Sequence, residues 1–202
     1  MKQVIKKILV FVVGIILIPH VVVFLIASSI GRGKNKLQMD LDVYKKHKNM
    51  NSNNVYSFLQ LMIFCPEYRN VFYFRLPIFV RIPLYYWPQR TTLHIWTKSR
   101  NIGGGLYVGH GWGTVINAKQ IGQNCIVGQN VTIGSRNALE PILGDSVGVY
   151  AHAVVLGNVH IGDNVQIGAG AVVVKDVPED CVVVPSKSII IKQKGERVNI
   201  PL

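Results

Sequence analysis

Residues 121–174 read IGQNCIVGQNVTIGSRNALEPILGDSVGVYAHAVVLGNVHIGDNVQIGAGAVVV, and a short repeat runs through them. An aliphatic residue returns every six positions, usually followed by glycine, with one longer interval between Ile133 and Leu143. The repeated aliphatic positions are Ile121, Val127, Ile133, Leu143, Val149, Val155, Ile161, Ile167 and Val173. A small residue follows four places later, at Cys125, Val131, Val147, Ala153, Val159, Val165, Ala171 and Val177.

A period of six residues excludes the common regular structures. Neither the 3.6-residue period of an α-helix nor a seven-residue repeat fits it, and turn residues recur too often for simple hairpins. A coil with three flat sides does fit, because each side can be a short strand and each corner a turn. We therefore expect a mainly β chain, with a parallel β-helix of hexapeptide repeats over residues 102–188.

The basic charge lies entirely in the first half of the chain. Residues 1–101 hold 15 Lys/Arg and 3 Asp/Glu, a net charge of +12, whereas residues 102–202 hold 7 of each. A basic half can indicate nucleic-acid binding. Here the basic half is also the apolar and aromatic one, which favours an anionic membrane surface. We expect membrane lipid as a partner and no nucleic acid.

The three cysteines form an odd and widely spaced set, Cys65, Cys125 and Cys181. No two of them have the spacing of metal ligands, and Cys125 occupies a core position of the repeat. We expect all three to be reduced and structural, as in a cytosolic protein, and we expect no metal site.

Residues 1–30 are expected to form a membrane-embedded anchor. The run 8–30 contains no Asp, Glu, Lys or Arg and is long enough to cross a bilayer, which takes about 20 apolar residues. Pro19 interrupts the run at its middle, and Lys/Arg flank both ends, so the positive-inside rule favours neither orientation. A re-entrant hairpin, a single span and a buried helix of a soluble protein all remain open, and the hairpin fits both observations best.

Residues 31–101 are expected to be a basic, aromatic linker or helical region. The polar part, 31–54, has the composition of a linker or a short surface helix. The part at 55–90 mixes arginine with aromatic residues and prolines, which suits either the headgroup layer of a membrane or a helical cap on one end of the coil. Residues 189–202 are expected to be a C-terminal tail.

Glycine crowds the entry to the coil around His110. Glycine at this density allows a ligand to approach the backbone. The inward positions here are expected at Ile102, Val108, Val115 and Ile121, with a slip of one residue after Val108.

These residues resemble a known family. GGGLYVGHGWGTVINAKQIGQNCIVGQNVTIG at 103–134 and VYAHAVVLGNVHIGDNVQIGAGAVVVKDVP at 149–178 are similar to the serine acetyltransferase branch of the left-handed β-helix acyltransferases. PEYRNVFYFRL at 66–76 is similar, more faintly, to relatives encoded with surface-polysaccharide genes. The resemblance implies a left-handed β-helix, acetyl-CoA as acyl donor, a homotrimer, and active sites between subunits.

The resemblance also implies roles for individual residues. The family's Gly-Leu-Tyr-Ile-x-His-Gly motif assigns the catalytic histidine to His110, with His152 as an alternative base. The alanine amides that meet the cofactor match Ala151 and Ala169, and the basic residue near its phosphates matches Lys187. The expected substrate contacts are Gly109, Trp112 and Arg136.

The expected chemistry needs a general base, because a hydroxyl is too weakly acidic to attack a thioester unaided at neutral pH. An imidazole can take the proton during attack, and backbone N–H groups in glycine-rich turns can stabilise the oxyanion.

Departures from the family pattern bear on the acceptor. Gly109 stands where the family has Asp, Thr92 aligns with its base-orienting Asp, and 139–141 replaces its Arg-His-Pro loop. Losing charged contacts to a small zwitterion should cost several kcal/mol of recognition, and the short loop after Ile133 leaves a more open cleft.

We therefore expect a membrane-associated glycan or lipid-linked sugar as acceptor, at the cytoplasmic face of the inner (plasma) membrane, where acetyl-CoA is available. The alternatives are a serine O-acetyltransferase of cysteine biosynthesis and a non-catalytic trimeric scaffold.

Overall fold

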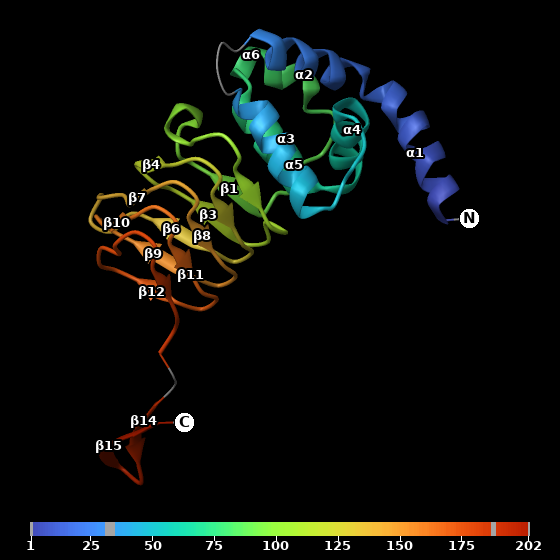
Figure 1. Cartoon of the computed structure of the whole chain (residues 1–202). Coiled ribbons are helices and arrows are strands. Elements are labelled where there is room, and N and C mark those ends of the chain that lie inside the picture. Colours follow the sequence, from blue (N-terminus) through green and yellow to red (C-terminus); the bar gives the residue numbers. More distant parts are fainter. Residues whose placement is uncertain (1, 31–34, 187–188, 202) are drawn as a thin grey trace.

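The second half of the chain is a three-walled parallel coil, shown in a computed structural model that describes residues 2–30, 35–186 and 189–201. Wall A has the strand order β1-β3-β6-β9-β12, wall B has β4-β7-β10, and wall C has β2-β5-β8-β11-β13. All pairings within the three walls are parallel. The expected mainly β solenoid of hexapeptide repeats is confirmed (Figure 1).

The strands of the coil are short and regular. Their bounds are β1 Leu93–Ile95, β2 Tyr107–Val108, β3 Thr114–Ile116, β4 Gln120–Ile121, β5 Ile126–Val127, β6 Thr132–Gly134, β7 Ile142–Leu143, β8 Gly148–Val149, β9 Val154–Leu156, β10 His160–Ile161, β11 Gln166–Ile167, β12 Val172–Val173 and β13 Val182–Val183.

Register stacks the repeated aliphatic residues on one another inside the coil. Along wall C, Val108 pairs with Val127, Val127 with Val149, and Val149 with Ile167. All four side chains are fully buried, and burying one such side chain contributes about 1.5–3 kcal/mol. The periodic hydrophobic positions therefore supply the main stabilisation of this half of the chain.

The corner between β2 and β3 is longer than the sequence predicted. Ile116, which is fully buried, pairs with Ile133, whereas Val115 is half-buried and pairs with Thr132. The expected inward position at Val115 is therefore wrong by one residue. The corner accommodates the additional residues because several of them adopt left-handed backbone conformations.

A second departure from regularity is the interval after β6. Arg136 and Leu139 exchange two backbone hydrogen bonds of 3.0 and 3.1 Å, and the two residues between them, Asn137 and Ala138, both have positive φ. This is a tight two-residue hairpin turn, and it projects from the corner between walls A and B.

The first half of the chain is helical. Its elements are α1 Lys2–Ile16, α2 Ile18–Ile30, α3 Lys36–His47, α4 Asn54–Phe64, α5 Pro66–Arg75, α6 Ile78–Arg81 and the 3₁₀ turns η1 Ile82–Leu84 and η2 Ser99–Asn101. Asn35 and Asn53 cap α3 and α4 by accepting a backbone N–H from Leu37 and Tyr56, as N-cap side chains do.

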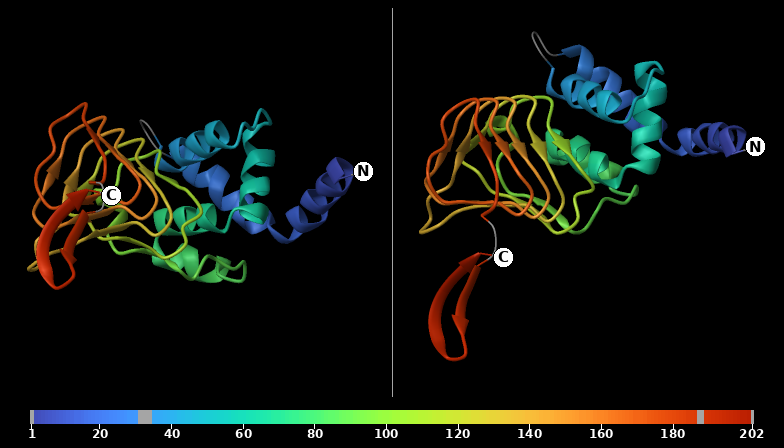
Figure 2. Two further views of the ribbon diagram at one scale, coloured as in Figure 1. Left: turned by 90° about the horizontal axis from the view of Figure 1, so that it is seen from below. Right: turned by 60° about the horizontal axis from the view of Figure 1, so that its bottom comes forward.

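The helix α3 is neither a linker nor a surface helix. It lies against the first coil together with α5, and four of its residues are buried, Leu37, Asp40, Leu41 and Tyr44. Asp40 forms a buried ion pair with Arg75 of α5 at 2.8 Å. Within residues 55–90, α5 packs on the end of the coil, as expected of a cap, and this packing leaves the membrane alternative a prediction (Figure 2).

The apolar N-terminal run is two helices bent by 79° at Leu17. No single described helix is long and apolar enough to cross a membrane, although the bent pair meets the length and composition criteria together. Leu17, His20 and Phe24 are buried against the helical cap. A bent pair of this kind is compatible with a broken span or a re-entrant loop, so the membrane anchor expected for residues 1–30 stays a prediction.

The C-terminal residues form an antiparallel hairpin instead of a plain tail. Its strands are β14 Ile189–Gln193 and β15 Glu196–Pro201. The hairpin extends away from the coil (Figures 1 and 2).

Candidate active site

The corners that connect wall C to wall A form one column along the coil. In successive coils they contain His110, Gln129, Ala151 and Ala169, each two residues after an inward aliphatic of wall C. The sequence-predicted residues Gly109, His110, Trp112, Ala151 and Ala169 are thereby brought to one edge of the molecule.

His110 projects from the longest of these corners. Its backbone has φ of 64°, followed by Gly111 at 65° and Gly113 at 55°, a region that costs an ordinary residue about 1–2 kcal/mol. The N–H of Gly111 donates to the carbonyl of Gly109 at 2.8 Å, which tightens the turn. The His110 side chain is exposed, so its imidazole is accessible to substrates.

The coil below supports this corner. The N–H of Asn130 and the hydroxyl of Thr114 both donate to the carbonyl of Trp112, at 2.6 and 3.1 Å. The Thr114 hydroxyl also lies 3.0 Å from the carbonyl of Gly128. These bonds hold the corner in its left-handed backbone conformation.

The helical cap holds the strand that leads into His110. The strand β2 is the edge of wall C, so its outer backbone groups lack a partner strand. The Tyr44 hydroxyl accepts the N–H of Val108 at 3.1 Å and donates to its carbonyl at 3.2 Å, while Asp40 accepts the N–H of Leu106 at 2.8 Å. Burial raises the pKa of Tyr44, which keeps the donating proton in place.

A charged and aromatic cluster adjoins His110 that the sequence did not reveal. The Arg90 guanidinium lies 3.9 Å from the centroid of the Trp112 ring and forms a 3.5 Å ion pair with the buried Glu67. A side chain at Gly111 would meet Arg90 and Glu67 within about 3.4 Å. No repeat or motif links these residues, because they come from α5, a loop and the coil.

The amides of Ala151 and Ala169 are free to contact a ligand. Their neighbours donate within the coil, from His152 to Gln129 and from Gly170 to Ala151, both at 3.0 Å. Among the described residues, the N–H groups of Ala151 and Ala169 have no hydrogen-bond acceptor. Two such unpaired donors in successive coils suit the carbonyl oxygens of an extended ligand.

The remaining predicted residues lie elsewhere. His152 is in the same column but two coils from His110, roughly 10 Å at the spacing of parallel strands. Arg136 lies on the hairpin at the corner between walls A and B, where its side-chain stem packs on Gly157. One chain therefore does not bring Arg136 to His110. Lys187 lies outside the described residues.

Cys65 and Cys125 are buried thiols, and Cys181 is half-buried. Burial raises the pKa of Cys125 to about 12 and that of Cys65 above its usual value, so neither is a nucleophile at neutral pH. Across residues 2–30, 35–186 and 189–201, no group of three or more His, Cys, Asp or Glu side chains is placed to hold a metal ion.

Comparison with known proteins finds the same fold. Residues 140–175 match the family model described as bacterial transferase hexapeptide (six repeats). The chain is 40% identical over 130 residues to the serine acetyltransferase of Synechococcus elongatus, covering 62% of this chain and 53% of that protein. It is 43% identical over 102 residues to the serine acetyltransferase of Staphylococcus aureus, covering 48% of each. The chain thus spans about half the length of these relatives.

Solved structures of serine acetyltransferases are also similar. Isoform 3 of Entamoeba histolytica, in complex with cysteine, superposes with a TM-score of 0.59 at 28% identity, covering 77% of this chain and 60% of that one. The Neisseria gonorrhoeae enzyme, in complex with serine, gives a TM-score of 0.55 at 29% identity, covering 74% and 65%. The coil of this chain has the hexapeptide-repeat, left-handed β-helix fold of acyltransferases, and its homologues are named serine acetyltransferases.

Proposed function

We propose that this protein is an O-acetyltransferase that moves the acetyl group of acetyl-CoA to a hydroxyl, with His110 as general base. The observation that carries the proposal is the corner column, which combines an accessible histidine on a strained turn with free amides in successive coils. The similarity to serine acetyltransferases supports it.

The chemistry follows from the positions of these groups. As the acceptor oxygen attacks the thioester carbonyl, the His110 imidazole takes its proton. The C–S bond then breaks, the acetyl group stays on the acceptor oxygen, and the imidazolium returns the proton to the departing thiolate. The Ala151 and Ala169 amides are suited to hold the donor along the corner, and Lys187 is the proposed contact for its phosphates.

Free serine is the acceptor that the comparisons favour. The sequence departures led us to expect a glycan, yet the named relatives are serine acetyltransferases, and one solved relative contains serine. In this protein Arg90, which stacks on Trp112 and pairs with Glu67, and Arg136, on the hairpin loop, are two cations that a carboxylate could meet.

A sugar acceptor is the second candidate, and one observation favours it. The Trp112 ring is 53% exposed two residues after His110, and an aromatic face presents an apolar surface of the kind that a sugar ring can pack against. The glycan candidate would place the sugar ring over Trp112 and its acceptor hydroxyl toward the His110 imidazole.

We also propose that the protein is a homotrimer through the β-helix. The outer face of wall A carries a register-matched row from Val115 through Thr132 and Val154 to Val172. Val172 is 65% exposed in the single chain, and a flat apolar wall of this kind is typically covered by another protein surface. A trimer would allow Arg136 of one subunit to approach His110 of the next.

The acceptor is tested by measuring thiol release from acetyl-CoA with L-serine and, separately, with the polysaccharide precursor of the host. Serine-dependent release with formation of O-acetylserine supports the first candidate. Thiol release with the glycan precursor and not with serine supports the second candidate in place of the first. Failure to release thiol with either acceptor, by protein that binds acetyl-CoA, favours the non-catalytic scaffold.

A further inference from the structure

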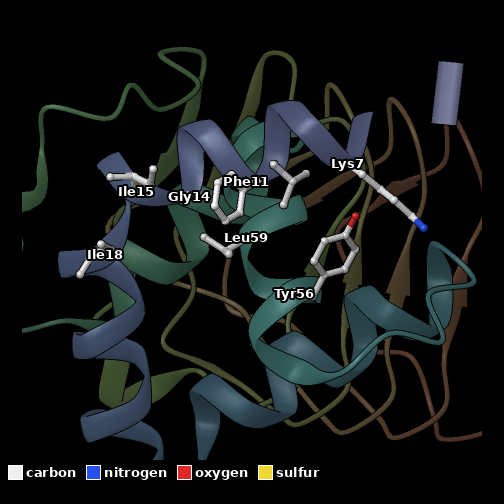
Figure 3. A pocket seen from close by; sticks show the side chains of 8 residues that line it. Lys7, Phe11, Gly14, Ile15, Ile18, Tyr56 and Leu59 are labelled. Carbon is white, nitrogen blue, oxygen red and sulfur yellow. The ribbon is translucent and has the colours of Figure 1, made fainter. Parts of the chain in front are cut away.

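An apolar groove runs between α1 and α4, on the far side of the helical cap from the coil (Figure 3). Its volume is about 450 Å³. Apolar contacts line most of its length, from Val10, Phe11, Gly14, Ile15, Ile18 and Leu59. At one end the lining changes to the Lys7 ammonium and the Tyr56 hydroxyl, as Figure 3 shows.

A second, polar pocket begins where the groove ends. The two share Lys7 and Tyr56, and the polar pocket has a volume of about 340 Å³. Its lining adds Lys6 and Lys48, together with Asn51 and Ser52. The two cavities together match an amphiphile, with hydrocarbon in the groove and a polar head among hydrogen-bond donors.

The positive charge of the polar pocket favours an anionic head group. Three lysines line it, and no Asp or Glu lines either cavity. Residues 1–39 also contain no acidic residue. Ammonium groups without local counter-ions attract an anion, and lysine is a common partner of phosphate.

The surface around the groove is apolar over a wide area. Phe11 is 73% exposed, Ile15 58% and Ile18 54%, and Phe79 and Ile82 near α2 are 75% and 59% exposed. Several large apolar side chains exposed on neighbouring helices are typical of an interaction site. Each arm of the bent pair is shorter than the hydrocarbon core of a bilayer, since 15 residues of helix extend about 22 Å.

Contacts with the helical cap fix the bend between α1 and α2. The Tyr86 hydroxyl donates to the carbonyl of Ile16 at 2.7 Å, and the buried His20 ring lies 2.8 Å from the Tyr73 hydroxyl. Since the backbone at the bend is thus partnered by the cap, the two arms are held at a fixed angle. Because the axes of two joined helices lie in one plane, α1 and α2 can lie flat together in a membrane interface.

We propose that the groove and the lysine pocket bind one anionic phospholipid of a bilayer, with an acyl chain along the groove and the phosphate among Lys6, Lys7 and Lys48. The arms α1 and α2 then lie in one leaflet as a monotopic anchor and do not cross the bilayer. This proposal is independent of the acetyl acceptor.

The test uses full-length protein and flotation with two kinds of vesicle, phosphatidylcholine alone and phosphatidylcholine with phosphatidylglycerol. Wild type should prefer the anionic vesicles, and the preference should weaken with added salt. Replacing Lys6, Lys7 and Lys48 with glutamine should reduce binding to anionic vesicles roughly fivefold per lysine. Lys46→Gln, a matched charge change on α3 outside both cavities, should bind as wild type does.

A groove-filling variant tests the acyl-chain part. Gly14→Leu places a side chain toward Leu59, whose nearest methyl is 3.5 Å from the position of a Cβ at Gly14. Native mass spectrometry should find one bound anionic lipid per protomer in wild type and none in Gly14→Leu, with acetyl transfer unchanged in both. Equal binding of wild type to both vesicle types, or a wild-type preference in the triple lysine variant, would overturn the proposal. So would the absence of bound lipid in wild type.

Discussion

Tyr44 links the helical cap to the residue proposed as the base. Its hydroxyl satisfies both backbone groups of Val108, two residues before His110. An edge strand normally needs a partner for these groups, and here a single phenol supplies it. The position of His110 therefore depends on a residue that lies more than sixty positions earlier in the sequence.

Tyr44→Phe should lower the free energy of unfolding by about 1–3 kcal/mol, because a buried N–H and a buried carbonyl lose their partner. Chemical denaturation measures this change. Tyr150→Phe is the matched control, because the Tyr150 hydroxyl bonds the Gln166 side chain at an exposed position. Its expected effect is within about 0.5 kcal/mol, and equal effects of the two changes would refute the special role of Tyr44.

His20 should make the helical cap sensitive to acid. Burial lowers the pKa of His20 from its ordinary value of 6.5, so the unfolded chain binds the proton more readily than the folded one. Stability is then fully present above about pH 6.5 and falls as the pH drops from there toward the lowered pKa.

The measurement is the unfolding free energy of wild type minus that of His20→Gln between pH 8 and pH 5. The difference should be constant above about pH 6.5, the ordinary pKa of the His20 side chain, and should shrink below it. A difference that does not vary with pH would show that His20 titrates normally in the folded protein.

At the scale of single elements, two glycines at equivalent corners allow the cost of a left-handed backbone to be distinguished from the cost of a steric clash. One of them, Gly113, lies in the wide corner after β2. Gly113 has φ of 55°, and a Cβ there would come within 2.5 Å of the Asn130 amide oxygen. Gly170 occupies an equivalent left-handed turn, at 74°, with no atom within 4 Å of its Cβ position.

Gly170→Ala should therefore cost only the left-handed conformation, about 1–2 kcal/mol. Gly113→Ala should cost more and should also lower acetyl transfer, since the neighbouring His110 backbone would shift. Thermal unfolding together with turnover checks both variants. Comparable losses of stability and unchanged turnover would argue against a tightly fitted corner.

The same corner shows what the sequence could and could not predict. The six-residue period fixes walls and inward positions wherever it is unbroken, because only one register buries all the aliphatic residues. At Val115 the period breaks, and both Val115 and Ile116 are apolar, so the pattern cannot identify which one faces inward. The structure resolves this through pairing of Ile116 with Ile133.

The packing of the helical cap on the coil cannot be predicted from the sequence, for a physical reason. Several of the cap's contacts with the coil are made by polar groups, such as Arg75 with the carbonyl of Gly103 and Asp40 with the N–H of Leu106, and hydrophobic periodicity carries no signal for them. The Glu67–Arg90–Trp112 cluster was missed for the same reason, because its members are close only after the cap and coil have packed. His110, by contrast, lies in a local motif, so the sequence alone predicts it as a candidate base.

At the scale of the whole molecule, the proposed trimer requires contact along wall A. Val172→Asp should weaken it, because a charge on an apolar interface is costly unless paired. His160→Asp places the same charge on the polar wall B and should leave the assembly intact. Light scattering in detergent should give a trimer mass for wild type and His160→Asp and a lower mass for Val172→Asp, whereas a monomer mass for wild type would contradict the trimer.

The central claim is that the corner column is an acetyl-transfer site in which His110 is the base. The most direct measurement is the turnover of acetyl-CoA with the preferred acceptor by wild type, His110→Ala and His152→Ala, alongside equilibrium binding of acetyl-CoA by each. The account predicts a loss of about 10²–10⁴-fold in turnover for His110→Ala, with acetyl-CoA still bound, and a smaller loss for His152→Ala. Near wild-type turnover by His110→Ala would contradict it.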